Sequence, residues 1–238
     1  MAARSEQLFE DGARYAGEWR GECRHGHGIH VDQDGSVYEG QWVDDKAEGF
    51  GRLRHPDGAA YFGAWRQNLK HGDGTYVHTD GSKYCGQWKD DSQHGDGTEE
   101  WADGATFRGQ YVCGRKSGDG AYHWPNGSRY EGQLVDNMIH GQGMYIWGDG
   151  CKYIGEWANQ AMEGHGKFSD PHGLMYLGQF VGNLKHGLGT QTGPEGLVYR
   201  GEWREGEMHG VGESSDGEVY FWDRGVRGEK APLEQVTV

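Results

Sequence analysis

Large aromatic residues and glycines recur at every second position in a short pattern, Tyr-x-Gly-x-Trp, that returns every 23 residues along this chain. The segment DGSKYCGQWKDDSQHGDGT carries the pattern at Tyr84, Gly86 and Trp88 and continues into His-Gly-x-Gly. Residues two positions apart lie on the same face of a pleated strand. The pattern therefore predicts a β-strand that carries Tyr, Gly and Trp on one face.

The pattern runs nine times in one register without an insertion. The first aromatic positions are Tyr15, Tyr38, Tyr61, Tyr84, Phe107, Tyr130, Tyr153, Tyr176 and Tyr199. Glycine follows two residues later in every unit, and the large residues four positions on are Trp19, Trp42, Trp65, Trp88, Tyr111, Leu134, Trp157, Phe180 and Trp203. A pair of glycines completes each unit, from Gly26 and Gly28 to Gly210 and Gly212. Such self-similarity indicates a repeat architecture.

A turn signal precedes each aromatic residue. It reads Asp-Gly or Asn-Gly in seven units, from Asp11-Gly12 to Asp149-Gly150, and weakens to His172-Gly173 and Glu195-Gly196. These dipeptides favour tight hairpin turns, because both residues can adopt positive φ. Each unit is thus predicted to be a strand, a six-residue loop such as Lys89–His94, a second strand beginning at His-Gly-x-Gly, and a turn.

The abundance of glycine, 45 of 238 residues, is matched by 30 aromatic residues. Glycine is costly to order in a strand, so we expect these glycines to leave room for rings that lie over bare backbone and recover the lost stability. A single hairpin is marginal in water and must stack on its neighbours. The predicted fold is all-β: an elongated, single-layer antiparallel meander of stacked β-hairpins with about 18 strands.

The register also predicts the domain organisation. Residues 1–9 form an N-terminal extension and residues 10–212 form the repeat array. After Gly212, the turn Asp216-Gly217 leads to Tyr220 two residues early, so residues 213–228 are interpreted as a degenerate repeat that caps the last edge. Residues 229–238 remain as a C-terminal tail.

The motif Tyr-x-Gly-x-Trp with a Gly-x-Gly pair and an Asp-Gly turn resembles the MORN repeat (membrane occupation and recognition nexus) over residues 10–212. The resemblance implies about nine repeats and one concave, aromatic-rich face. It also implies a scaffold, because family members occur in ciliary radial-spoke heads, in cytoskeletal rings and baskets of protists, and in proteins that bridge membranes. In other members the array precedes a phosphoinositide kinase or a histone lysine methyltransferase. We expect no such domain here, since the repeats occupy nearly all of the 238 residues.

The charge narrows the range of partners. The net charge is −14, with 37 acidic residues against 23 Lys and Arg, which disfavours nucleic acid and anionic membranes. The loops are expected to hold only scattered cations, at Lys46, Lys70, Lys89, Arg115, Lys116 and Lys185. Neither a secretory signal nor an apolar run of about 20 residues is present, and the four cysteines form no framework. These features predict a cytoplasmic protein.

The histidines before the glycine pairs are the most prominent candidates for chemistry: His25, His71, His94, His140, His186 and His209. Successive members belong to successive hairpins, about 9–10 Å apart, which is too far for one zinc ion. We expect structural or turn-capping roles and leave a pH-sensitive surface open, with no metal and no cofactor. A regular array repeats one environment and offers no unique catalytic group, so we expect no enzyme.

The aromatic rows have two interpretations. The rings stack on their own repeats, or they are shared with a partner, because a single-layer sheet has little against which to bury its second face. The predicted partner-binding residues are Trp42, Tyr61, Trp65, Tyr84, Trp88, Phe107, Tyr111, Tyr130, Tyr153 and Trp157. An amphipathic helix in the groove or a second copy, giving a homodimer, would suit such a surface.

These observations predict a non-enzymatic scaffold or adaptor that binds a protein partner or itself. The family resemblance extends this to a radial-spoke assembly of the cilium axoneme or to a cytoskeletal assembly. Two alternatives remain. One is an adaptor that associates with phosphoinositides and membranes, and the other is a targeting module for an enzyme, such as a phosphoinositide kinase, that acts in trans.

Overall fold

The computed structural model describes residues 2–231, with side chains from residue 6 onward. It divides into two compact units, Met1–Ser117 and Gly118–Val238, which are described separately below as unit 1 and unit 2. The described residues form 21 β-strands and one three-residue 3₁₀ helix, η1 (Pro194–Gly196). The prediction of an all-β fold of stacked antiparallel hairpins is confirmed.

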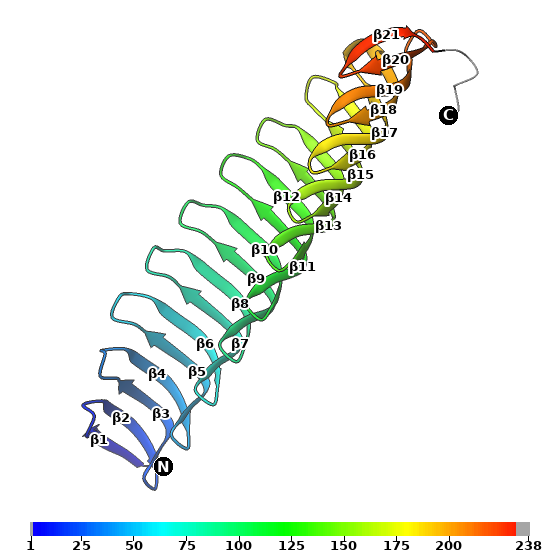
Figure 1. The fold of residues 1–238 in the computed structure, drawn as a ribbon. Coiled ribbons are helices and arrows are strands. Elements are labelled where there is room, and N and C mark those ends of the chain that lie inside the picture. The colour runs from blue at the N-terminus through cyan, green and yellow to red at the C-terminus, as the bar shows by residue number, and fades with distance from the viewer. Residues whose placement is uncertain (1, 232–238) are drawn as a thin grey trace. The chain divides into compact units, whose positions relative to one another are not determined.

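The strands follow one another along the chain with short connections (Figure 1). Unit 1 contains β1 (Ala2–Leu8), β2 (Arg14–Arg20), β3 (Cys23–Val31), β4 (Val37–Val43), β5 (Lys46–Arg54), β6 (Ala60–Arg66), β7 (Leu69–Val77), β8 (Lys83–Lys89), β9 (Ser92–Glu100) and β10 (Thr106–Val112). Strand β11 (Arg115–His123) includes the boundary between the units. Unit 2 continues with β12 (Arg129–Val135), β13 (Met138–Ile146), β14 (Lys152–Ala158), β15 (Ala161–Ser169), β16 (Met175–Val181), β17 (Leu184–Thr192), β18 (Val198–Arg204), β19 (Glu207–Ser214), β20 (Val219–Asp223) and β21 (Val226–Lys230).

Within each unit every strand pairs antiparallel with the next one, and the nine repeats supply the 18 strands from β2 to β19. The pairing brings the glycines of successive strands opposite one another, as in Gly28↔Gly40, Gly40↔Gly51 and Gly51↔Gly63. A row of glycine backbone therefore crosses the strands of each unit. We call the side of the sheet that carries the motif Tyr and Trp rings the inner face, and the other side the outer face.

Each tyrosine ring covers the glycine of the following strand. A Cβ added to Gly51 would lie 2.3 Å from the Tyr38 hydroxyl oxygen, and one added to Gly74 would lie 2.2 Å from the hydroxyl oxygen of Tyr61. Tyr61 is fully buried in consequence. The prediction that these glycines make room for rings is confirmed, and it explains why no larger residue occupies the positions.

The other glycine of each pair creates a β-bulge. In β4 and β5, Gly40 faces Gly51 and Trp42 faces Ala47, so three residues of β5 stand opposite Gln41 alone. Gly49 adopts a φ of +73° within this bulge, a conformation that glycine permits without strain. The bulge leaves backbone groups without a ladder partner, and two motif side chains satisfy them: the Tyr38 hydroxyl donates to the Gln41 carbonyl (3.0 Å), and the Gln41 Oε1 accepts from the amide of Phe50 (2.7 Å).

The turn within each repeat differs from the prediction. Lys89 pairs with Ser92, and the two residues between them, Asp90 and Asp91, have φ values of +48° and +66°. The predicted six-residue loop at Lys89–His94 is therefore wrong, and the second strand begins at Ser92 rather than at the His-Gly-x-Gly motif. Two-residue turns with two positive φ angles match the twist of the flanking strands, and Asp and Asn tolerate this conformation better than most residues.

The Asp-Gly turns also differ from the prediction. The Gly35 amide donates to the Asp32 carbonyl (3.0 Å) and the Asp32 amide donates to the Ser36 carbonyl (2.9 Å), which closes a three-residue loop. Only Gly35 has positive φ (+86°), so the expectation of two such residues is wrong. The Asp34 carboxylate instead accepts a hydrogen bond from the Ser36 amide (2.7 Å), and this bond explains the preference for Asp or Asn before the glycine.

The last hairpin has shorter arms than the others. Trp222 faces Gly210 and Tyr220 faces Gly212, so Trp222 takes the place of the motif tryptophan, and its ring packs 5.1 Å from that of Tyr199. The sequence predicts Tyr220 as a displaced motif tyrosine, whereas the strand pairing puts Tyr220 where the motif has glycine.

On edge strand β21, Lys230 pairs with Glu218 (2.9 Å), and charged edges of this kind discourage further strand pairing.

The predicted boundaries at both termini stay predictions, although strands occupy parts of both segments. Residues 2–8 form β1, which pairs with β2, and residues 229–230 belong to β21. Most of the predicted tail, residues 232–238, lies outside the described residues.

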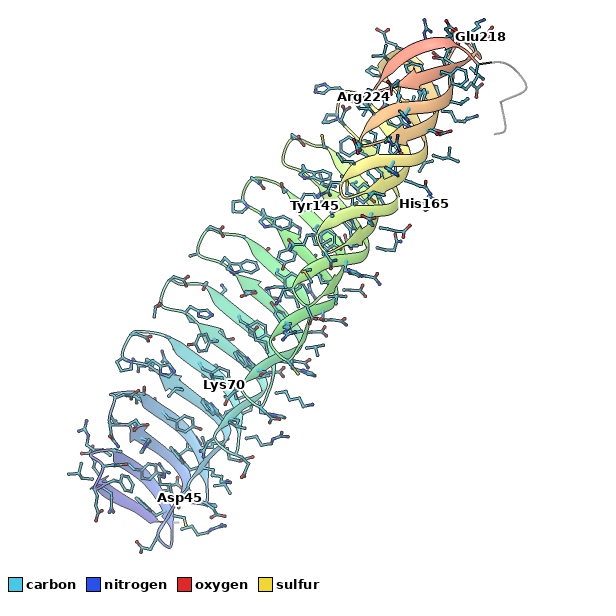
Figure 2. The ribbon with its side chains drawn as sticks, viewed as in Figure 1. Asp45, Lys70, Tyr145, His165, Glu218 and Arg224 are labelled. Carbon is cyan, nitrogen blue, oxygen red and sulfur yellow. The ribbon has the colours of Figure 1, made fainter. Side chains whose placement is uncertain are left out.

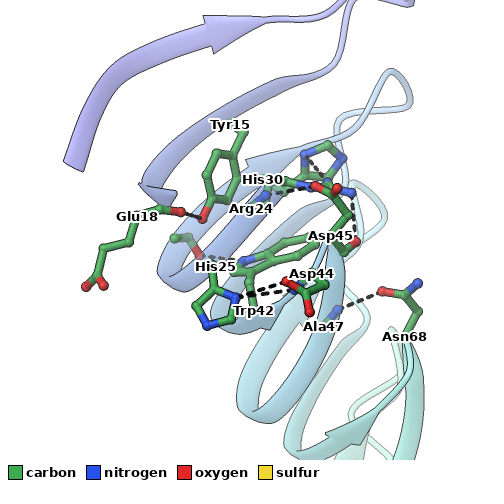
Figure 3. Close-up of polar contacts among 11 residues, drawn as sticks. Tyr15, Glu18, Arg24, His25, His30, Trp42, Asp44, Asp45, Ala47 and Asn68 are labelled. Atoms are coloured by element: carbon green, nitrogen blue, oxygen red, sulfur yellow. Dashed lines mark hydrogen bonds and ion pairs between the residues drawn. The ribbon is translucent and has the colours of Figure 1, made fainter. Parts of the chain in front are cut away.

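The two-residue turn of each hairpin can bind the strand that begins after the turn of the preceding hairpin, as Asn68 and Ala47 show. The Asn68 amide donates to the Ala47 carbonyl (3.0 Å), and the Asn68 Oδ1 accepts from the Ala47 amide (2.7 Å; Figure 3). Replacing Asn68, which has a φ of +70°, by Ala should lower the free energy of unfolding by about 2 kcal/mol, because a hydrogen bond is lost and the backbone is strained. Asn68→Asp, which keeps the acceptor, should cost about 0.5 kcal/mol. Urea denaturation would measure both, and equal losses would contradict the role of the acceptor.

Candidate partner-binding groove

The structure places all ten predicted binding residues in the packed interior of the inner face. Their exposed fractions range from 0 % at Tyr61 to 7 % at Trp65. Seven of them form one series of contacts in unit 1, and Tyr130, Tyr153 and Trp157 form another in unit 2. A binding role for these ten residues stays a prediction, and their observed contacts are with their own repeats.

The contacts alternate tyrosine and tryptophan in edge-to-face geometry. Tyr38 contacts Trp42 at 5.0 Å between ring centroids and Trp65 at 5.1 Å, with interplanar angles of 84° and 87°. The next hairpin continues in the same way through Tyr61. Each such pair adds about 0.5–1.5 kcal/mol beyond the area buried. The indole nitrogen of Trp65 also donates to the Gly51 carbonyl of the preceding hairpin (3.2 Å), so the rings join hairpins as well as fill them.

A second layer of side chains covers these rings in unit 1, and much of it is cationic. Arg24 lies over Trp42 (4.3 Å to the ring centroid), Lys70 over Trp88 (5.5 Å) and Lys116 over Trp101 (4.9 Å). The expected loop positions of the lysines are therefore wrong, because Lys70 and Lys116 stand on β7 and β11. These cations cover rings of the inner face and do not form a basic loop surface.

One position in this layer is too small to cover its ring. Ala47 stands where the neighbouring hairpins have Arg24 and Lys70, and a hollow of about 150 Å³ opens there, lined by Leu53, Trp65 and Asn68 among others. The inner face of unit 1 thus combines bulky cations with a small apolar depression. Small-molecule binding sites are usually larger than this depression. The depression is therefore too small to bind a ligand by itself.

Unit 2 carries a different surface on its inner face. Ile139 and Met162 stand here at two of the cation positions, while Lys185 still lies over Trp203 (4.7 Å). A continuous line of half-buried rings runs beside Ile139 and Met162, which we call the aromatic strip: Tyr122, Trp124, Tyr145, Trp147 and Phe168. Successive centroids in the strip are 5.1, 5.5, 4.7 and 6.1 Å apart. The repeated motif does not predict the strip, because the strip's tryptophans lie outside that motif.

The strip faces the interior of the curved hairpins and remains accessible. Tyr145 packs beside the buried rings of Tyr130 (6.4 Å) and Trp157 (6.1 Å). His165, by contrast, lies on the outer side of the strands (Figure 2), with 74 % of its side chain exposed. In the part of the chain that the structure describes, no hydrogen bond joins the indole nitrogens of Trp124 and Trp147 or the Tyr145 hydroxyl to a protein group. These donors are available to a ligand.

His25, the first histidine of the row, caps a turn. His25 Nδ1 accepts from the amide of Asp44 in the next hairpin (3.4 Å; Figure 3). Glu48, which interrupts the row, accepts from the Gln67 amide in the same way (2.9 Å). A histidine and a glutamate thus accept the same hydrogen bond in equivalent turns of two hairpins. Because glutamate can replace histidine here, a structural role is favoured. Among residues 2–231, no cluster of three or more His, Cys, Asp or Glu side chains is arranged to hold a metal ion.

The buried tyrosines make the fold sensitive to alkali. Burial raises the pKa of Tyr153 to about 12 from an ordinary value of 10, and it raises the pKa of Tyr15 and Tyr199 in the same direction. An acid whose pKa is higher in the folded state contributes stability that is complete below pH 10 and is lost between pH 10 and about 12. We therefore expect tyrosinate absorbance at about 295 nm to rise together with loss of the β-sheet circular dichroism signal. Ionisation of most tyrosines near pH 10 with the sheet intact would contradict this.

The described residues contain no helix long and apolar enough to cross a bilayer.

Several solved structures resemble parts of the chain. The SAS-4 TCP domain of Drosophila melanogaster, solved with a proline-rich motif of Ana2, is 10 % identical and covers 66 % of this chain and 86 % of its own, with a TM-score of 0.41. The TCP10 domain of Danio rerio CPAP, solved with a STIL peptide, is 14 % identical and covers 83 % and 93 %, with a TM-score of 0.37. Similarity this weak says nothing about what the present chain binds.

The family model gives a definite answer. The MORN repeat model matches nine consecutive segments, residues 15–37, 38–60, 61–83, 84–106, 107–129, 130–152, 153–175, 176–198 and 199–217. The matches begin at the motif aromatics and cover the strands that form both ring series. The chain belongs to the MORN-repeat family.

Proposed function

We propose that this chain is a non-enzymatic scaffold that binds a protein partner on the inner face of unit 2. The observation that supports this is the aromatic strip, whose rings are half-buried and whose indole donors bond to no protein group among residues 2–231. Ile139 and Met162 add apolar surface beside the strip. Accessible aromatic surface with polar tips is typical of protein-binding sites. The motif rings beneath provide a rigid base and leave recognition to the residues above them.

The test is affinity capture with the full chain. Wild-type protein is compared with Trp124→His/Trp147→His and with Leu188→Ala, an outer-face control whose native side chain is 68 % exposed. His78 occupies the equivalent position three hairpins before Trp147, so the histidine variant should fold. We expect mass spectrometry to find partners retained by the wild type and the control and lost from the histidine variant. Retention of no protein, or equal retention by all three, would reject the proposal.

Self-association is a second candidate, and a specific observation favours it. Phe50 and Phe62 stand on neighbouring strands of the outer face, each 62 % exposed. Exposed phenylalanines so close together are unusual in a monomer. If copies pair through this face, light scattering should show a dimer that Phe50→Ser/Phe62→Ser dissociates, while capture of partners by unit 2 is unchanged.

The family resemblance supports a cytoplasmic location for this scaffold, in a ciliary or cytoskeletal assembly. Light microscopy of the tagged full chain would test this. If the captured partner is concentrated at a cilium or a cytoskeletal structure while the tagged chain stays diffuse, the proposed location is contradicted.

A further inference from the structure

The chemistry of the aromatic strip indicates which conformation its partner adopts, and this inference rests on the proposed function of the strip. Equivalent rings recur from hairpin to hairpin: Tyr122, Tyr145 and Phe168 form one series, and Trp124 and Trp147 form another. Each hairpin advances by two strands, which is about 9.6 Å. The ring centroid of Tyr145 lies 5.5 Å from that of Trp124 and 4.7 Å from that of Trp147. The sum of these two distances is the upper limit for the separation of the two tryptophan rings, and this limit agrees with the hairpin spacing.

The repeat distance discriminates among the regular peptide conformations. A polyproline II helix has three residues per turn and a rise of about 3.1 Å, and therefore repeats every ~9.3 Å. Side chains on one face of a β-strand recur every ~6.8 Å. An α-helix repeats its face after about seven residues, or ~10.5 Å, and drifts by about 2 Å over three hairpins. The polyproline II repeat agrees with the hairpin spacing to within a few tenths of an ångström.

Hydrogen bonding favours the same conformation independently. The strip offers donors, the indole nitrogens of Trp124 and Trp147 and the Tyr145 hydroxyl, and each lacks a protein acceptor within residues 2–231. An α-helix has already satisfied its carbonyls internally. A polyproline II segment has no internal hydrogen bonds, so its carbonyls are free to accept from such donors. The buried Trp157, by comparison, donates to the Gly143 carbonyl (3.2 Å) and has no donor to offer.

We propose that the aromatic strip binds a proline-rich protein segment in the polyproline II conformation, with a proline at every third residue lying against successive rings. Proline-rich segments lose little entropy on binding, since the conformation is preformed. Residues 118–238 contain 17 Asp and Glu against 9 Lys and Arg. Basic residues between the prolines therefore complement the charge of unit 2.

The test uses three labelled synthetic peptides of about 12 residues, enough for four polyproline II turns. The first repeats Pro-Ala-Arg. The second has the same composition with its prolines regrouped so that the three-residue interval is broken. The third replaces proline by alanine and can form a helix. Fluorescence anisotropy with the full chain should show binding of the first peptide about tenfold tighter than the other two, and about tenfold weaker binding by Trp124→His/Trp147→His. Leu188→Ala should bind like the wild type.

Four outcomes would overturn the inference: equal binding of the regrouped peptide, tighter binding of the alanine peptide, loss of no affinity in the histidine variant, or no binding by any peptide at about 1 mM. Circular dichroism and unfolding of each variant establish that the strip was tested in a folded protein. The proposed function is judged separately by affinity capture. If captured partners depend on Trp124 and Trp147 while all three peptides fail, the scaffold proposal stands and only the conformation of its partner is wrong.

Discussion

Replacing Gly166 by alanine should destabilise unit 2 by about 3 kcal/mol, at the upper end of the cost of overpacking. The added Cβ would lie 2.3–2.5 Å from three atoms of the Tyr153 side chain. That ring is fully buried and is held edge-to-face by Trp157 (5.0 Å) and Phe180 (5.1 Å), so it has no room to move. Gly166 does not have positive φ, and the backbone therefore accepts alanine without strain. Urea unfolding followed by tryptophan fluorescence would measure the loss.

Gly193→Ala is the matched control in the same unit. Gly193 has an extended backbone (φ −88°), and a Cβ there would meet nothing closer than 3.6 Å. Its replacement should change the free energy of unfolding by no more than about 0.5 kcal/mol. A loss below about 1 kcal/mol at Gly166, or a similar loss at both glycines, would show that the rings do not depend on bare backbone.

The strands could be predicted from the sequence because their faces follow a period of two. Tyr153, Gly155 and Trp157 recur at every second position, and no other regular structure places those three side chains on one side. The division of labour between the paired glycines could not be predicted. Gly164 has a φ of +61° and forms the bulge, whereas Gly166 lies under a ring, and a glycine in a sequence gives no sign of which conformation it adopts.

The two turns were confused for a related reason. Asp34-Gly35 matches the strongest short hairpin signal and predicts the tightest turn, whereas Asp44-Asp45 belongs to a charged segment that is typical of a loop. In the structure the turn at Asp44 and Asp45 is the shorter of the two, with two residues that both have positive φ, and the Asp34-Gly35 turn is the longer, with three residues. The hydrogen bonds that make this favourable come from the preceding hairpin, as in the Asp45 amide to the Arg24 carbonyl (3.1 Å). A local rule cannot detect such a partner.

The regularity of the repeat directs a sequence-based prediction of binding residues to the motif rings. Residues that recur in every hairpin, such as Tyr61 and Trp65, are those that every hairpin needs for its own packing. The position of Trp124 and Trp147, by contrast, holds Phe9, Asp32, His55, His78, Trp101, Asp170 and Gly193 in the other hairpins. Since the fold accepts all of these, a local concentration of tryptophan is free to serve recognition. Departures from the repeat were thus the available signal for the aromatic strip.

Breaking the ion pair between Glu99 and Lys116 should destabilise unit 1 by about 3 kcal/mol. The Lys116 Nζ and Glu99 Oε2 atoms are 2.6 Å apart, with 11 % and 19 % of the two side chains exposed. The carboxylate also accepts from the Tyr111 hydroxyl (3.1 Å). Either Glu99→Ala or Lys116→Ala leaves a poorly solvated charge without its partner, and this penalty exceeds the value of the pair itself. Lys83→Ala is the control, because Lys83 and Glu100 are about half exposed and should contribute less than about 0.5 kcal/mol.

The double substitution Glu99→Tyr/Lys116→Met should recover nearly all of that loss. The other hairpins show which residues suit these positions, since tyrosine occupies the first in three of them and Met162 occupies the second. Replacing a buried pair by apolar residues that fit is often neutral or stabilising, so the double variant should unfold within about 1 kcal/mol of the wild type. Urea unfolding of Glu99→Tyr, Lys116→Met and the double variant, with Lys83→Ala as the control, would complete a double-mutant cycle. If the losses in the free energy of unfolding of the two single variants add up to that of the double variant, the two charges act independently. Burial of the pair would then have no energetic consequence.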